Sequence, residues 1–314
     1  MRALRAVKQE SLRSFLFPIT FIICVLSATL LSEELTIEVK SGLRLAVGAI
    51  VPALFPFMIL ADLIASSADC GGRSLILLPF ERIFGISSGA ARAFLVGNIA
   101  GAPVAATMLS SLLANGKISK SEAERTLAIS SSPSLAFTVS GVGAAMWEDT
   151  AIGIALYLSV ILASLIYGVF TRERHFVSGE ESSNTAPRFD LMASIERATF
   201  SSLRIIGVVT AFSVASGLVS YFSLTARLAP CIIPLLEIGS AASYLSECHL
   251  HRLTALALTA FSLGFSGFSI HLQVGGALAK NEINCSRFSR AKLVIGLLSA
   301  AIFALIYTAR LKFL

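Results

Sequence analysis

The sequence predicts an all-α polytopic membrane protein, and two observations carry that prediction. The first is composition: of 314 residues, 55% are hydrophobic and 14% are charged, whereas soluble globular domains carry about 25% charged residues. The second is arrangement, because about 20 apolar residues suffice for a helix to cross a bilayer. Windows without Asp, Glu, Lys or Arg recur along the chain: Phe15–Leu31, Leu45–Ala61, Ala93–Gly116, Thr126–Trp147, Thr150–Thr171, Ile205–Ala226, Leu253–Ala279 and Leu293–Ala309. A further window, Leu228–Ser246, is broken only by Glu237.

This composition excludes a secreted protein, a nucleic-acid-binding protein and an ordinary cytosolic enzyme. The net charge of +6 is not a nucleic-acid signal, because Lys and Arg in membrane proteins mainly report which loops face the cytoplasm. The five cysteines are irregularly spaced and form no CxxC pair. We therefore expect no disulfide framework, no metal site and no cofactor.

Residues 1–33 are expected to form a cytoplasmic tail and an N-terminal transmembrane helix. The basic residues of the tail place it in the cytoplasm by the positive-inside rule. The window Phe15–Leu31 ends without the small-x-small cleavage site of a signal peptide, so the helix is expected to be retained. The next stretch, Ser32–Ser41, has three Glu against one Lys, and we expect an outside loop there.

Residues 42–171 are expected to form a first repeat, and residues 172–197, with four Arg, a cytoplasmic linker. The crossing Leu45–Ala61 runs inward and leads to a basic loop that is expected inside. Three windows lie between that loop and the linker, so three full crossings would put the linker outside. The conflict disappears if Thr126–Trp147 enters and leaves on one face. Its Ser130-Ser131-Ser132-Pro133-Ser134 run favours such a broken helix. A plain kinked helix is the alternative.

Residues 198–314 are expected to form a second repeat with the same plan: a helix, a helix with a mid-membrane polar residue, a broken segment and a helix. The broken segment is Leu253–Ala279, which has five Ser and Gly residues near its middle and is followed by a basic loop with Lys280, Arg287, Arg290 and Lys292. It too is expected to enter and leave from one side. The first repeat starts outside and the second inside, so the repeats are inverted. Inverted repeats with interrupted helices are typical of many secondary transporters, whose binding sites lie near the midplane.

Two polar residues within the apolar windows are the first candidates for function. Glu237 is a charge deep in a membrane segment, which is costly and therefore functional by default. It is expected to carry a coupling proton or a cation such as Na⁺. The alternative is a neutral or arginine-paired acid that holds helices together. Asn98 is its expected counterpart in the first repeat, either as a substrate ligand or as a hydrogen-bonding link between helices.

The two broken segments supply the other candidates for substrate binding. Unwound backbone exposes helix N-termini, which attract anions, and carbonyl groups, which attract cations. Polar side chains and glycine would complete such a site: Ser131, Ser132 and Ser134 in the first segment, and Ser266, Gly267, Ser269, His271 and Gln273 in the second. For His271 the alternative is a structural hydrogen bond between helices.

An intramembrane hydrolase is a competing class, because Gly264-Phe265-Ser266-Gly267 matches the GxSG pattern of rhomboid-type serine proteases. Those enzymes take their base from a histidine on a later helix. No histidine follows His271, which lies in the same segment as Ser266. A serine without a base is unreactive, so we do not expect an enzyme.

Several runs resemble the YlbJ/SpoVV family of sporulation integral membrane proteins. The first repeat contributes Val51-Pro-Ala-Leu-Phe-Pro-Phe57, Gly101-Ala-Pro-Val104 and Asn115-Gly-Lys-Ile-Ser-Lys-Ser-Glu-Ala-Glu-Arg125. The second contributes Leu235-Leu-Glu-Ile-Gly239 and Phe265-Ser-Gly-Phe-Ser-Ile-His-Leu-Gln273. The resemblance extends from about Gly42 to the last helix. It implies a nucleoside-recognition gate domain, related to the core of concentrative nucleoside transporters.

The resemblance also implies a substrate, dipicolinate, carried into the developing spore across the outer forespore membrane. The two carboxylates would suit two half-helix N-termini with serine hydroxyls, and Phe137 or Phe268 would lie beside the ring. Expected partners are thus this small molecule, the lipid bilayer and a proton or Na⁺. A nucleoside or another carboxylate remains an alternative substrate, and a non-transporting scaffold of a sporulation complex is the alternative class.

Overall fold

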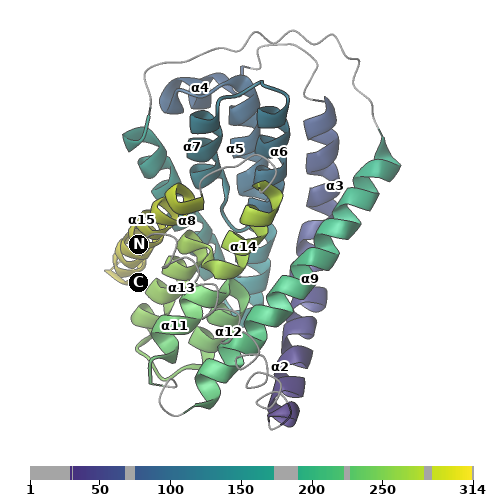
Figure 1. Cartoon of the computed structure of the whole chain (residues 1–314). Helices are drawn as coiled ribbons and strands as arrows, with labels where there is room; N and C mark the ends of the chain where they lie inside the picture. The colour runs from purple at the N-terminus through teal and green to yellow at the C-terminus, as the bar shows by residue number, and fades with distance from the viewer. Residues whose placement is uncertain are drawn as a thin grey trace, which may run out of the picture.

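The computed structural model describes residues 29, 31–67, 75–172, 190–222, 227–278 and 285–312. Within these ranges every regular element is a helix (Figure 1). Four described helices have the length and apolar composition to cross a membrane, and there are six candidates when each of two bent pairs counts as one span. The all-α polytopic fold is therefore confirmed. Most of the helix expected over Phe15–Leu31 and most of the linker lie outside the described residues.

The first repeat begins with a long bent helix made of α2 (Ser32–Leu45), a π-helical turn η1 (Ala46–Ile50) and α3 (Val51–Ser67). Pro56 lies inside α3, where a missing backbone donor favours bending. The outside loop predicted over Ser32–Ser41 is therefore wrong. Its acidic residues Glu33 and Glu34 stand in the first turn of α2, where the helix dipole favours them, and α2 packs along α9.

A helical hairpin follows. After α4 (Leu78–Phe84), the chain bends by 101° into α5 (Ser88–Ala100). It then reverses at Gly101 into α6 (Ala102–Ala114), and α5 and α6 pack against each other. Gly101 has φ 105°, a value that glycine adopts readily and other residues rarely adopt. We call this pair hairpin 1.

The predicted interruption lies after hairpin 1. Helix α7 (Lys120–Ser130) ends at the irregular stretch Ser131–Ser134, which we call break 1. The chain continues into the π-helix η2 (Phe137–Met146), and α8 (Thr150–Phe170) completes the repeat. Pro133 within break 1 disfavours helix for the residue before it.

The second repeat has the same order of elements. Helix α9 (Leu191–Tyr221) is followed by hairpin 2, formed by α11 (Ala229–Leu236) and α12 (Ile238–Glu247), which reverses at Glu237. Helix α13 (Arg252–Phe265) is separated from α14 (Gly267–Leu278) at Ser266, which we call break 2. Helix α15 (Cys285–Lys312) ends the described chain.

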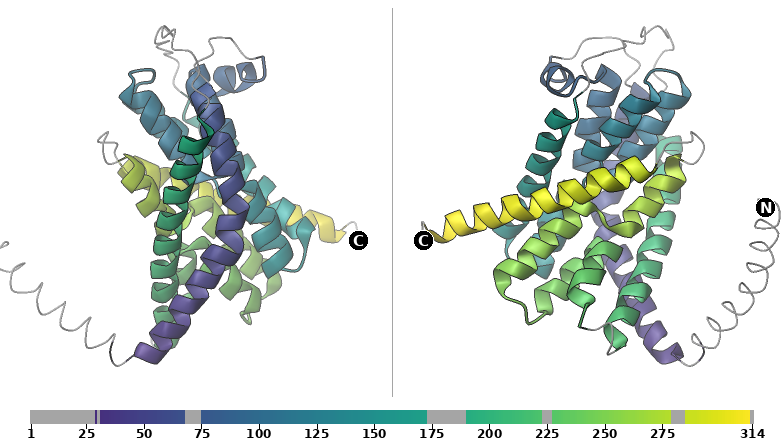
Figure 2. Two further views of the ribbon diagram at one scale, coloured as in Figure 1. Left: turned by 90° about the vertical axis from the view of Figure 1, so that its right-hand side faces the viewer. Right: turned by 60° about the vertical axis from the view of Figure 1, so that its left-hand side comes forward.

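The two repeats are inverted. Figure 1 shows hairpin 1 in the upper half of the molecule and hairpin 2 in the lower half, while the long helices α3 and α9 run along one side. Figure 2 shows the same division from two further directions. Each hairpin also packs on the second half-helix of the other repeat, hairpin 1 on α14 and hairpin 2 on η2.

The segments that turn back in the structure are not the ones that the sequence predicts to be re-entrant. The breaks lie where the sequence predicts them, but Arg252–Gly276 has the length and hydropathy of one span through break 2. Helix η2 likewise leads away from α7: Trp147 at its end shares a polar pocket with Glu247 and Arg252, at the far ends of α12 and α13. The elements that turn back are hairpins 1 and 2. Charge counting finds that one window per repeat must return, but it cannot identify which.

Helix starts and ends are fixed by local chemistry. Ser119 accepts a hydrogen bond from the backbone nitrogen of Glu122 at the start of α7, and Asp149 accepts from Ala151 at the start of α8. The buried Arg125 donates to the carbonyl groups of Phe84 and Thr171, at the ends of α4 and α8. These carbonyls have no partner within their own helices, so the arginine joins three helices at one end of the molecule.

Candidate functional site

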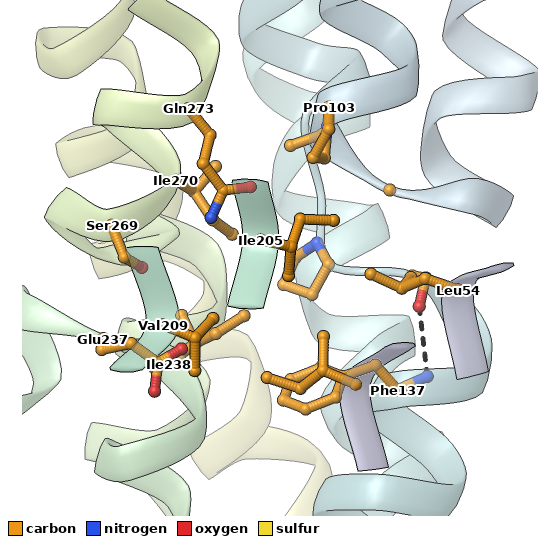
Figure 3. Close-up of a pocket in the computed structure, with 15 residues that line it drawn as sticks. Leu54, Pro103, Phe137, Ile205, Val209, Glu237, Ile238, Ser269, Ile270 and Gln273 are labelled. Atoms are coloured by element: carbon orange, nitrogen blue, oxygen red, sulfur yellow. Dashed lines mark hydrogen bonds between the residues drawn. The ribbon is translucent and has the colours of Figure 1, made fainter. Parts of the chain in front are cut away.

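A cavity lies where the interruptions of both repeats meet (Figure 3). Its empty volume, including the part open to the outside, is ≈ 440 Å³. Residues from η1 and α3, hairpin 1, break 1 and η2, α9, hairpin 2 and α14 form its wall: Ile50, Leu54, Gly101, Ala102, Pro103, Pro133, Ser134, Phe137, Ile205, Val209, Glu237, Ile238, Ser269, Ile270 and Gln273. The wall is mostly apolar, with a few polar groups.

In the first repeat, break 1 brings a hydroxyl and an aromatic ring to the cavity. Ser134 is 2% exposed, and its Oγ accepts a hydrogen bond of 3.2 Å from the backbone nitrogen of Phe137. The hydroxyl thus caps the half-helix that begins there. A Cβ built on Gly101 would lie 3.6 Å from the nitrogen of Ser134, so the tip of hairpin 1 rests on break 1.

In the second repeat, Glu237 stands at the tip of hairpin 2. It is 1% exposed, and its Oε2 accepts a hydrogen bond of 2.5 Å from the backbone nitrogen of Ser240. The carboxylate therefore caps α12, whose N-terminal dipole favours a negative charge. Among the described residues no Lys or Arg forms an ion pair with Glu237. The arginine-paired alternative thus finds no support, and backbone amides hold the carboxylate.

Helix α14 adds Ser269 and Gln273 to the wall. Ser269 is 1% exposed, and its Oγ has no hydrogen-bond partner in the described part of the chain. Because buried hydroxyls are usually hydrogen-bonded, this group is available to a ligand. Gln273 is 6% exposed and lies one helical turn further along the same face.

The remaining serine and glycine candidates lie behind the wall, where the two breaks touch. Ser266 Oγ donates a hydrogen bond of 3.1 Å to the carbonyl oxygen of Ser131. Ser131 and Ser132 are fully buried, and their hydroxyls have no partner among the described residues. Gly267 has φ 56°, and a Cβ built there would lie 3.1 Å from the carbonyl oxygen of Leu236. Hairpin 2 thus rests on break 2, as hairpin 1 rests on break 1.

Two candidates lie away from the cavity. Asn98 Nδ2 donates to the carbonyl oxygens of Phe94 at 2.9 Å and Ile129 at 3.3 Å, so its amide links α5 to α7. His271 stands on the face of α14 opposite Gln273, with its ring centroid 4.9 Å from that of Phe288 on α15. The structure therefore separates His271 from Gln273.

Sequence reasoning missed Lys292, which it assigned to a basic loop. The structure places it in α15, fully buried, with Nζ 6.0 Å from the centroid of the Phe288 ring. A signal for this exists in the sequence. Phe288, Lys292, Gly296 and Ser299 recur at helical spacing, and the structure buries all four.

Four half-helices begin around the cavity or directly behind its wall. They are α6 after Gly101, the helix that Ser134 caps, α12 after Glu237, and α14 at Gly267. Helix N-termini carry a partial positive charge, so the site suits a negatively charged or strongly polar ligand. Within the described ranges no group of three His, Cys, Asp or Glu side chains could hold a metal ion.

These features define a class: a polytopic α-helical membrane protein built on an inverted repeat, with interrupted helices around a central cavity. Many secondary transporters share that architecture. The chain is 26% identical over 327 aligned positions to the sporulation integral membrane protein YlbJ of Bacillus subtilis (strain 168), covering 90% of this chain and 80% of that protein. The chain is thus related to the YlbJ family. No family model and no solved structure matches it.

Proposed function

We propose that the protein is a secondary transporter or facilitator for a small anionic molecule, dipicolinate, and that it acts during sporulation. The observation that carries the proposal is the cavity wall, to which both hairpins and both broken helices contribute. The relationship to a sporulation membrane protein supports the setting. A scaffold would have no need to gather four interruptions, each costly in a membrane, around one cavity.

The two repeats provide a means for the cavity to open on alternate sides. Hairpin 1 and hairpin 2 approach it from opposite ends of the molecule (Figure 1). Ile50 and Leu54 on one long helix and Ile205 and Val209 on the other close it laterally. Moving one hairpin away from its break would open one end, and the inverted repeat makes the second opening equivalent to the first.

Dipicolinate fits the chemistry of the wall. Its carboxylates would accept hydrogen bonds from the hydroxyls of Ser134 and Ser269 and lie near half-helix N-termini. The ring of Phe137, 3% exposed, would pack beside the pyridine ring. Glu237 would bind the coupling proton or a Na⁺ ion, since it is the acidic side chain of the wall.

We further propose a bacterial cell membrane, the outer forespore membrane, as the location, with the N-terminus in the cytoplasm. The positions of basic residues support this orientation. The turn between α6 and α7 contains Lys117, and Lys120 begins α7. This turn lies at the end of the molecule where α4 carries Arg82 (Figure 1). Arg172 follows α8 at the same end, next to the Thr171 carbonyl that Arg125 contacts.

The test is uptake of labelled dipicolinate into proteoliposomes that contain the purified full chain, with a nucleoside as parallel substrate. Glu237→Gln is the key variant, because glutamine can still cap α12 but cannot hold a proton or a cation charge. We expect saturable dipicolinate uptake that this variant loses at equal protein level. Uptake of the nucleoside alone would replace the substrate, and uptake of neither would favour the scaffold.

A further inference from the structure

Lys292 is a buried amine for which the described residues supply no negatively charged partner. Its side chain is fully buried, and Nζ makes no hydrogen bond to the described residues. The Phe288 ring, 6.0 Å away, offers a cation–π contact that offsets only part of the cost of burying an ammonium group. Buried charges are normally paired, and an unpaired buried amine tends to lose its proton instead, so a charge on this lysine requires a negative group within reach.

The neighbouring histidine does not neutralise it. His271 Nδ1 lies 2.6 Å from the carbonyl oxygen of Gly267, so that nitrogen carries a proton and donates it. An imidazole, neutral or protonated, brings no negative charge. The nearby ion pair of Arg287 with Glu124, 3.5 Å apart, has its own charges balanced.

Helical register places Lys292 opposite break 2. One turn after it, Gly296 packs on α13, where a built Cβ would lie 3.0 Å from the nitrogen of Phe265. One turn before it, the Phe288 ring contacts His271 on α14. Residues four apart share a face of a helix. Lys292, midway between these two contacts, therefore faces the junction at Ser266, which in turn touches break 1 through Ser131.

The cavity lies on the other side of the same junction. Ser269 and Gln273 of α14 line it, and Glu237 packs on Gly267, where a built Cβ would lie 3.3 Å from Glu237 Cα. A helix with its side chains is about 10 Å across. A molecule in the cavity is thus separated from Lys292 by roughly one helix, on the order of 10 Å.

We propose that Lys292 determines the substrate class of the cavity: protonated when an anion occupies the cavity, it acts across α14 and makes the site accept a carboxylate although Glu237 lines it. This inference rests on the proposed transport function. Two unit charges about 10 Å apart at an effective dielectric constant of about 20 attract enough to change affinity roughly tenfold to twentyfold. Without Lys292, a Glu237 side chain that has bound neither a proton nor Na⁺ would repel a carboxylate.

The test compares equilibrium binding of two probes to the purified full chain: dipicolinate and its neutral diamide, pyridine-2,6-dicarboxamide. Lys292→Met keeps the length and apolar stem of the side chain and removes the charge. We expect dipicolinate affinity to fall about tenfold or more, while diamide affinity changes less than about twofold. Lys292→Arg should retain most of the affinity for dipicolinate. Removing Glu237 as well, in the Glu237→Gln/Lys292→Met double variant, should restore part of it.

Arg290→Met is the matched control, because it removes one positive charge from an exposed position on the same helix, and we expect unchanged binding. The inference is overturned if Lys292→Met leaves dipicolinate binding unchanged, if it weakens both probes equally, or if the wild-type protein binds the diamide as tightly as dipicolinate. A wild-type protein that binds neither probe refutes the proposed function itself, and this inference with it.

Discussion

Replacing Gly267 with alanine tests whether hairpin 2 rests on break 2. The residue has φ 56°, and an alanine Cβ would lie 3.1 Å from the carbonyl oxygen of Leu236 and 3.3 Å from Glu237 Cα. The left-handed conformation costs a residue with a Cβ about 1–2 kcal/mol. The close contact adds to that cost because both neighbours are backbone atoms. We expect the variant to be destabilised by about 2 kcal/mol.

Gly276→Ala is the matched control on the same helix. Nothing lies within 4 Å of a Cβ built there, and alanine favours a helix interior by about 1 kcal/mol over glycine. The assay is the midpoint of thermal inactivation of the purified protein in detergent. We expect a fall of several degrees for Gly267→Ala and no fall for Gly276→Ala. Equal midpoints would refute the packing of the hairpin tip on the break.

Further predictions concern the polar groups, measured in the same assay and by dipicolinate binding. Ser134→Ala should weaken binding and also cost about 1 kcal/mol of stability, because it removes a helix cap. Ser269→Ala should weaken binding with unchanged stability, because its hydroxyl has no partner among the described residues. Unchanged binding in both variants would show that these hydroxyls are not part of the site. Asn98→Ala should destabilise by about 1–3 kcal/mol through the loss of two buried hydrogen bonds and leave affinity unchanged, so that a selective loss of affinity would contradict its structural role. Asp62→Asn should cost no more than about 1 kcal/mol, because its partner Arg197 is 52% exposed, and a larger loss would show that the pair fastens α3 to α9.

The sequence predicts the repeats because their helices and breaks differ in amino-acid composition. Apolar windows mark the helices, and Pro133 and the Ser-Gly cluster near Ser266 mark the breaks. Local composition does not indicate the direction in which the chain continues after a break. That direction depends on contacts such as Gly101 against Ser134 and Gly267 against Leu236, which join residues far apart in the chain. For this reason the sequence predicts re-entrant segments at the breaks, whereas the structure places the returning elements at hairpins 1 and 2.

The residues of the site likewise include some that the sequence predicts and some that it does not. Polar residues at membrane depth are visible in a sequence, and Ser134, Glu237, Ser269 and Gln273 all line the cavity. Which face of a helix turns inward is a matter of packing, and α14 turns His271 toward Phe288, away from Gln273. The apolar part of the wall, such as Leu54 and Val209, looks like any other lipid-facing sequence and could not be singled out.

The central claim is that dipicolinate binds in the cavity. The most direct test is whether dipicolinate protects a cysteine in the cavity from chemical modification. Ser269→Cys would be introduced on α14 in a chain whose native cysteines are replaced, with Gly276→Cys, exposed on the same helix, as control. The measurement is the rate of modification by a small thiol reagent in proteoliposomes that transport dipicolinate. We predict that dipicolinate slows modification at position 269 in a saturable manner and leaves position 276 unaffected. Modification at both positions at rates independent of dipicolinate would contradict the account.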